Sequence, residues 1–291
     1  MHTITFTCET ITPMFLSGAD GTTPELRAPS IKGALRFWWR AMNGHLSLGD
    51  LKKQEGEIFG DNNNRSKFTL FIKEVNLIPH KAAPTPHRGY PIPCLLPGSI
   101  FEVTLTVPVT TPQWNIEKCK TLFELTCILG DFGKRARRGM GSVHITNCKI
   151  TSRHPKWLGF QWKQTPVTIP HIHRLLQEFS SFYTLRNGAI YHSYSGSMQY
   201  YPWIKQIQLG EPDTNLLMKI SKATHNIKAS SALTYEASLG HAKGGRFASP
   251  VYVSVVKGSL KPIITSLNTI PDRNSRDISL RLQDDFKNAI L

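Results

Sequence analysis

The segment LGDFGKRARRGMGSVHI concentrates residue types that bind anions. Four cations fall within five positions, and glycines flank them on both sides. Arginine can bind a phosphate through two parallel hydrogen bonds, and glycine tolerates positive φ and a close backbone approach to a ligand. A solvated turn is the alternative. The pattern favours a phosphate-binding loop, formed by Gly133, Lys134, Arg135, Arg137, Arg138, Gly139 and Gly141.

This loop does not have the spacing of a nucleoside-triphosphate site. GxxxxGK[ST] is absent, and the segment leads into a strand and not into a helix. We therefore expect no nucleotide cofactor and no metal. A weaker version of the design, LGHAKGGRFASPVYVSV, adds Lys243 and Arg246 as candidate contacts. A plain hairpin or bulge explains that second segment equally well.

A second cationic group lies in SIKGALRFWWRAMNG, which is typical of a helix that closes near Asn43-Gly44. Lys32, Arg36 and Arg40 are spaced i, i+4, i+8, so they fall within about 80° of one another on the helix surface. No acid interrupts them, which predicts an anionic ligand; a solvated helix face is the alternative. Trp39 borders this stripe and could stack on a base, although it could equally pack in the core.

The loop before this helix, TPMFLSGADG, supplies small residues whose backbone N–H groups could bind phosphate. Ser17 and Gly18 are the candidates there. Arg27 and Ser30 follow, and Ser30 stands where an N-cap residue is expected. We therefore include Ser17, Gly18, Arg27 and Ser30 among the predicted contacts.

The overall charge points to the same class of ligand. The chain has 35 Lys and Arg residues against 20 Asp and Glu residues, a formal net charge of +15. Such an excess favours a polyanionic partner, because each neutralised phosphate releases condensed counterions. General solubility is the alternative reading of the charge. The clustering of cations in the loop and the helix favours the partner.

Cysteine usage and hydropathy indicate the compartment. The five cysteines are odd in number and include no CxxC pair, so neither a disulfide framework nor a zinc ribbon fits. No apolar stretch approaches the roughly 18 residues that a membrane span needs, and the N-terminus does not resemble a signal peptide. We expect a cytoplasmic protein with no membrane partner.

The pattern of elements predicts an α+β fold. Strands are expected at residues 2–10, 67–75, 99–109 and 142–150, with helices from Ser30 and over residues 114–130. The resulting order, β-α-β-β-α-β, is that of a ferredoxin-like (RRM-like) domain, whose antiparallel sheet leaves one face or rim free for a ligand. The proline-rich residues 79–98 look too long for a simple hairpin.

The second half is less regular. Helices are expected over residues 168–185, 214–228 and 277–290, and paired strands over residues 249–258 and 262–270. This alternation suggests a second, diverged ferredoxin-like copy. The chain is therefore predicted to contain tandem ferredoxin-like domains at residues 1–152 and 153–291.

The segments LRAPSIKGALRFWWRA and FGKRARRGMGSV together resemble the RAMP superfamily of CRISPR-associated proteins and, within it, the first Cmr subunit of the type III-B effector complex. The EIFG tetrapeptide at Glu57–Gly60 also fits, whereas residues 155–240 match poorly. The resemblance implies assembly with other Cmr subunits. It also implies binding of CRISPR RNA and single-stranded target RNA near the guide 3′ end, with Gly133–Gly141 as the RAMP glycine-rich loop.

Some RAMP proteins cut RNA without a metal, using a histidine near the first helix. Here His144 and His241, near the two glycine-rich segments, are the only histidines worth testing, and no pair of carboxylates stands out. We therefore expect a non-catalytic RNA-binding subunit. The alternatives are a metal-independent endoribonuclease that processes CRISPR RNA and an architectural subunit whose basic face meets acidic partner proteins.

Overall fold

The structure is a computed structural model in which most of the chain can be described. It describes residues 2–85, 89–108, 114–152, 157–194, 201–230, 238–241, 247–270 and 278–291. Lys243 and Arg246, two of the predicted contacts, lie outside these ranges. Within them, no helix is both long and apolar enough to cross a membrane.

The first half of the chain forms a four-stranded antiparallel sheet around β1 (His2–Thr10). Alternation along β1 turns Ile4, Phe6 and Cys8 into the core and leaves the intervening threonines partly exposed. The strand order β3-β6-β1-β7 confirms the predicted ferredoxin-like arrangement. Its other elements are α1 (Ala28–Met42), β3 (Thr69–Asn76), β6 (Ile100–Val107), α3 (Ile116–Leu129) and β7 (Val143–Thr151).

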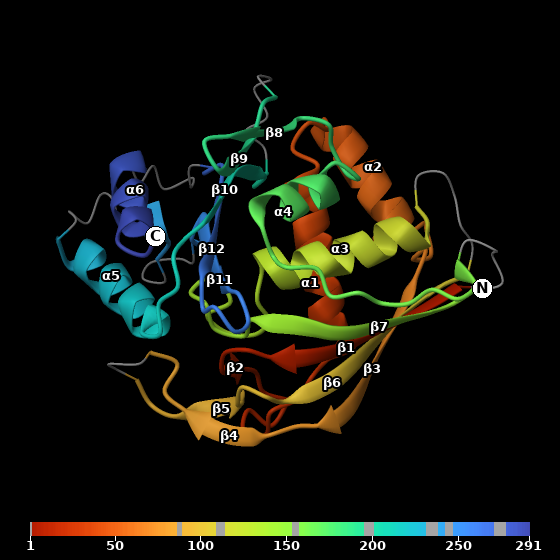
Figure 1. Cartoon of the computed structure of the whole chain (residues 1–291), viewed down its shortest axis with the longest axis horizontal. Coiled ribbons are helices and arrows are strands. Elements are labelled where there is room, and N and C mark those ends of the chain that lie inside the picture. Colours follow the sequence, from red (N-terminus) through yellow and green to blue (C-terminus); the bar gives the residue numbers. More distant parts are fainter. Residues whose placement is uncertain are drawn as a thin grey trace.

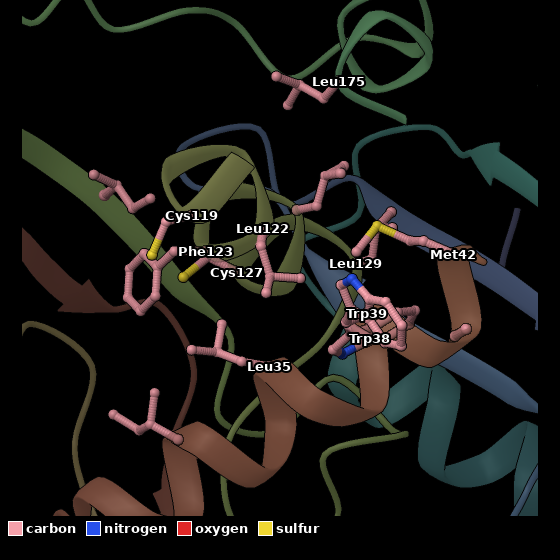
Figure 2. Close-up of a cluster of buried hydrophobic side chains, with 14 of the residues drawn as sticks. Leu35, Trp38, Trp39, Met42, Cys119, Leu122, Phe123, Cys127, Leu129 and Leu175 are labelled. Atoms are coloured by element: carbon pink, nitrogen blue, oxygen red, sulfur yellow. The ribbon is translucent and has the colours of Figure 1, made fainter. Parts of the chain in front are cut away.

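Helices α1 and α3 lie side by side over this sheet, and α3 also contacts the second sheet (Figure 1). Phe6 of β1 stacks on Phe123 of α3 with ring centroids 4.3 Å apart. Figure 2 shows Leu35 of α1 beside the α3 side chains Leu122 and Phe123, within one apolar cluster. Because this core is continuous from one sheet to the other, the division into residues 1–152 and 153–291 remains a proposal.

The second half forms a five-stranded antiparallel sheet in the order β11-β12-β10-β9-β8. Four of its strands repeat the spatial order of the first sheet, with β10 in the place of β1 and α5 in the place of α1. Strand β9, which takes the place of β7, precedes β10, however, whereas β7 follows β1, so the second copy is diverged, as predicted. Its elements are β8 (Tyr183–Arg186), β9 (Ala189–His192), β10 (Ile204–Leu209), α5 (Leu216–Ser230), β11 (Val251–Val255), β12 (Pro262–Leu267) and α6 (Leu280–Asn288).

Strands β11 and β12 are covered on both faces, which explains their unbroken apolar sequences. Tyr252 faces the core shared with α1 and α3, whereas Val251, Val253 and Val255 face the cluster under α5 and α6. In Figure 1 these two helices lie on the side of the second sheet away from α1 and α3. The molecule is thus layered as sheet, helices, sheet, helices.

Several elements differ from the sequence prediction. Helix α2 (Leu48–Phe59) was not expected, and residues 168–185 contain a short α4 (Ile169–Leu176) followed by β8 instead of one helix. The proline-rich segment does pair as a hairpin, in which β4 (Pro79–Ala82) joins β5 (Ile92–Leu95). β5 also pairs with β2 (Met14–Phe15), so this small sheet lies next to the loop that enters α1.

A half-buried aromatic cluster surrounds His192 at the end of β9. Its ring lies 4.9 Å from the ring of Tyr183 and 4.9 Å from that of Trp203. Its Nδ1 accepts a hydrogen bond from the backbone N–H of Tyr194 at 3.3 Å, and its Nε2 is buried without a hydrogen-bond partner. The neutral imidazole is therefore the form that this site accommodates.

Acidification will reduce the free energy of unfolding through His192. Burial, with a smaller contribution from His45, lowers the pKa of His192 to about 4, whereas an unfolded histidine titrates near 6.5. Between these values the unfolded chain binds a proton that the folded chain does not, so the stability present above about pH 6.5 is lost as the pH falls toward about 4. Allowing for partial solvent exposure of the ring, we expect a loss of about 2 kcal/mol.

Urea unfolding of the wild type and His192→Phe across this pH range measures the effect. The variant should lose about 2 kcal/mol less than the wild type. Equal losses in the two proteins would assign the acid sensitivity to other groups.

Candidate nucleic-acid interface

A cavity of about 580 Å³ lies between three segments that are distant in sequence. These are the loop that follows β2, the N-terminal half of α1 and the basic glycine-rich loop. Six of the predicted contacts line it: Ser17, Arg27, Ser30, Gly133, Lys134 and Arg137. The structure therefore brings together two of the motifs that the sequence singled out separately.

Backbone contact with β2 places the glycine-rich loop at this cavity. The backbone N–H of Lys134 donates to the Phe15 carbonyl at 2.7 Å. Gly133 has φ of 91°, and a Cβ at this position would lie 2.3 Å from the same carbonyl oxygen. Glycine is required here by positive φ and by a close backbone approach, as predicted, but the approaching group is a strand of the protein.

The four cations of the loop divide into two pairs. Lys134 and Arg135 are exposed, and Arg135 adopts φ of 62° at the turn. Arg137 turns inward, where its guanidinium lies 4.6 Å from the ring centroid of Tyr252 and donates to the Ser249 carbonyl at 2.5 Å. The first pair is available to a ligand, whereas Arg137 offers only the part of its surface that lines the cavity.

Arg138 is not a phosphate contact, contrary to the prediction. It is 9% exposed, and its guanidinium donates to the carbonyls of Val251 and Leu239, both at 2.9 Å, and to the Ser249 hydroxyl at 3.1 Å. Burial lowers the pKa of its guanidinium, and Arg137 adds to the effect. This arginine ties the loop to the second half of the chain.

Gly139 and Gly141 have positive φ, as expected, but both are buried. A Cβ on Gly141 would lie 1.9 Å from the Phe132 carbonyl oxygen, and one on Gly139 would lie 3.1 Å from both Leu217 and Ile220 of α5. The predicted role of these two glycines at the ligand is therefore wrong. They permit close packing of the loop on itself and on α5.

The cationic stripe on α1 has an acidic neighbour that the sequence did not reveal. Glu55 of α2, 8% exposed, forms an ion pair with Arg36 and lies 3.5 Å from Arg40. Lys32 lies over the ring of Phe68 at 5.3 Å. Two of the three cations thus already contact a carboxylate, although the side chains of Arg36 and Arg40 remain 39% and 42% exposed.

The stripe and the cavity lie on different sides of α1. Ala34, which lines the cavity, is about 160° around the helix from Arg36. Gly33 lies between the two surfaces, about 60° from both Ser30 and Arg36. It is exposed, and a Cβ there would have no atom within 4 Å. The two cationic regions are therefore joined by an open strip of helix.

Three further expectations about this region are corrected. Trp39 is 3% exposed and packs edge-to-face on Phe59, so it cannot stack on a base; Figure 2 shows it within the apolar cluster. Ser30 is not the N-cap, because the helix begins at Ala28 after Arg27. The Gly18 N–H is already used, since it donates to Thr23 within its own loop.

Sequence reasoning missed several residues that shape the site. Phe37, Asp131 and Tyr252 line the cavity, and Glu55 faces the stripe. Phe37 was hidden in an apolar helix face, and Asp131 in a segment dominated by cations.

Neither His144 nor His241 lines the cavity, and the described residues contain no group of three His, Cys, Asp or Glu side chains that could hold a metal.

Comparison with known proteins places this architecture in a family. Residues 7–144 match the RAMP superfamily. The chain is 34% identical to CRISPR system Cmr subunit Cmr1-1 of Pyrococcus furiosus over 142 residues, which cover 42% of this chain and 41% of that protein. It is 40% identical to Cmr1-2 of the same organism over 187 residues, covering 50% of this chain and 96% of that protein.

Solved structures share the fold along the whole chain. The crystal structure of Cmr1 from Pyrococcus furiosus in its apo form has a TM-score of 0.62 at 18% identity, covering 100% of this chain and 97% of that one. A chain in the cryo-EM structure of the type III-B Cmr-beta complex bound to cognate target RNA has a TM-score of 0.59 at 9% identity, with both chains fully covered. These structures show the fold, and the sequence match to nearly all of Cmr1-2 shows that the chain belongs to the Cmr1 family of the RAMP superfamily.

Proposed function

We propose that this chain is the Cmr1 subunit of a type III-B Cmr complex and that it binds single-stranded RNA, either CRISPR RNA or its target, toward the 3′ end of the guide. The observation that carries the proposal is the convergence of exposed cations on one cavity from segments more than 100 residues apart. Arg27 approaches it from the N-cap position just before α1, and Lys134 from the glycine-rich loop. In a chain of net charge +15, such convergence favours a phosphate backbone as ligand.

The path that we propose for the RNA follows the exposed side of α1. It runs from Lys134 and Arg135 across Gly33 to Arg36 and Arg40. The absence of a side chain at Gly33 lets a backbone approach the helix closely. The 15 residues of α1 span about 22 Å, enough for several nucleotides. Recognition along this path is through phosphates and is independent of sequence.

We further propose that the subunit does not cut RNA. His144 contacts Gln164 through its Nε2 at 3.1 Å and lies outside the cavity. His241 is 9% exposed and is stacked on Phe247. Neither histidine is placed to exchange a proton with RNA bound at the cations.

Replacing both Arg36 and Arg40 with alanine will weaken binding of single-stranded RNA roughly three- to ten-fold and will flatten its salt dependence by roughly 0.7 for each lost phosphate contact. The substitutions are made together with Glu55→Gln, because the Glu55 carboxylate would otherwise be left buried without a partner. Fluorescence anisotropy at several salt concentrations gives both quantities.

The matched control removes two exposed lysines elsewhere, Lys205→Ala with Lys222→Ala, which lowers the net charge by two, one more than in the α1 triple variant. It should change affinity much less than the α1 variant does. An α1 variant with unchanged affinity and unchanged salt dependence would remove α1 from the RNA path.

A further inference from the structure

One carboxylate contacts both arginines of the α1 stripe. Glu55 extends from α2 with its Oε1 at the Nε of Arg36 and its Oε2 3.5 Å from the Nε of Arg40. Each guanidinium therefore meets the acid through its Nε edge. Within the described residues, no hydrogen bond engages the terminal Nη nitrogens of either arginine. The Nη edges of two partly exposed guanidiniums thus remain open to a ligand.

Glu55 is held in place by the helix that carries it. Its side chain is 11% exposed, and Ile58 and Phe59 on the same helix are buried as well. A carboxylate that left the two arginines would stay buried without a partner, which is strongly unfavourable. An incoming phosphate therefore finds the Nε edges occupied and the Nη edges free.

This arrangement requires arginine. A guanidinium has several N–H donors in a planar fork, so it can bind one anion at Nε and a second at Nη. A lysine ammonium is a compact point charge on a flexible stem, and next to Glu55 the carboxylate would attract it. Arg36 and Arg40 are one helical turn apart, a rise of about 6 Å. That rise is close to the step between neighbouring phosphates of a single strand.

The remaining charges around the pair leave little excess of positive charge. The backbone N–H groups of Asn63 and Asn64 hold the exposed Asp61 carboxylate, at 2.8 and 2.7 Å, and lower its pKa, and Arg36 adds a smaller effect. Lys32 lies one turn before Arg36. The three cations of the stripe and the two nearby carboxylates leave a net charge of +1. The orientation of the guanidiniums, more than the amount of charge, is then the basis of binding.

We propose that Glu55 is a positioning residue for RNA, which holds Arg36 and Arg40 by their Nε edges so that their Nη edges face two neighbouring phosphates. The inference rests on the proposed function and explains why a carboxylate lies inside a cationic path. A stripe of independent cations would bind RNA more tightly without the acid, whereas a positioned pair would bind less tightly. The sign of the change in affinity therefore separates the two cases.

Glu55→Gln keeps the shape of the side chain and removes its charge. We expect it to weaken binding of single-stranded RNA roughly two- to five-fold, although the net charge of the protein rises by one. The control is Glu211→Gln, at an acid whose side chain is 85% exposed, which raises the net charge equally and should not weaken binding. Fluorescence anisotropy measures the affinity, and urea unfolding establishes that each variant is folded.

Lysine substitutions give a second test, in which the effect of Glu55→Gln changes sign. Arg36→Lys with Arg40→Lys keeps the charge but should weaken binding nearly as much as the alanine substitutions do. Adding Glu55→Gln to this lysine variant frees both ammonium groups and should restore part of the affinity. A merely structural role of Glu55 would weaken binding in both backgrounds. Arg186→Lys with Arg281→Lys, at two exposed arginines elsewhere, is the control and should bind as the wild type does.

The outcomes separate this inference from the proposed function. Tighter binding by Glu55→Gln than by Glu211→Gln would make Glu55 a competitor of RNA and overturn the inference, while the proposed function would stand. Equal affinities of these two variants would leave the carboxylate without an effect on RNA and overturn it as well. If the α1 alanine variant binds like the wild type, the path along α1 fails and the inference with it. If the wild type binds no RNA, the proposed function itself fails.

Discussion

Replacing Arg138 with methionine will lower the free energy of unfolding by about 3–5 kcal/mol without removing an RNA contact. The guanidinium is buried and donates to two carbonyls and one hydroxyl from residues 239–251, and it lies 4.9 Å from the ring centroid of Phe286 in α6. Methionine fills a similar volume but donates nothing, so these acceptors lose their hydrogen bonds inside the protein. Urea unfolding at neutral pH measures the loss.

Arg135→Met is the matched control, since it removes the same charge from an exposed position three residues earlier. It should change stability by less than about 0.5 kcal/mol. A result in which both variants unfold at the same urea concentration as the wild type would mean that the buried hydrogen bonds of Arg138 contribute nothing net. The RNA affinity of the Arg138 variant, measured on the folded protein, should stay within a factor of about two of the wild type.

The first half of the fold could be predicted because its signals are local. β1 alternates strictly, and the helices and strands that follow have the lengths of a ferredoxin-like domain. The glycines of the loop were also placed correctly in positive φ. The reason for these glycines was predicted wrongly, because a sequence can show that the backbone needs positive φ at a position. It cannot show whether a ligand or the protein itself approaches the backbone there.

Two missed elements had local signals of their own. Ser47 caps α2 by accepting from the Asp50 N–H at 3.1 Å, a spacing typical of helix starts. Asn187 and Gly188, with φ of 48° and 71°, form the turn between β8 and β9, and Asn-Gly is a strong hairpin signal. Recognising the first would have placed Glu55 on a helix, and recognising the second would have ended the predicted helix over residues 168–185 earlier.

Other features of the site are set by long-range packing and have no signal in the sequence. The partners of Arg138 lie about 100 positions away, and Glu55 meets Arg36 only because α2 folds back on α1. Charge density singled out this loop but could not separate its two exposed cations from its two inward ones. That separation is a property of the contact between the two halves of the chain.

Replacing Lys134 and Arg135 with alanine will therefore weaken RNA binding roughly ten-fold at moderate salt and leave the free energy of unfolding nearly unchanged. Both side chains are exposed, and neither forms a salt bridge within the described residues. Their loss should also flatten the salt dependence by roughly 1.4, the value for two phosphate contacts on a single strand. Anisotropy titrations and urea unfolding of the same preparation measure both properties. Paired with Arg138→Met, the result distinguishes two roles within one loop: unchanged RNA affinity here would leave the loop as an internal brace alone, and binding would then have to reside on α1.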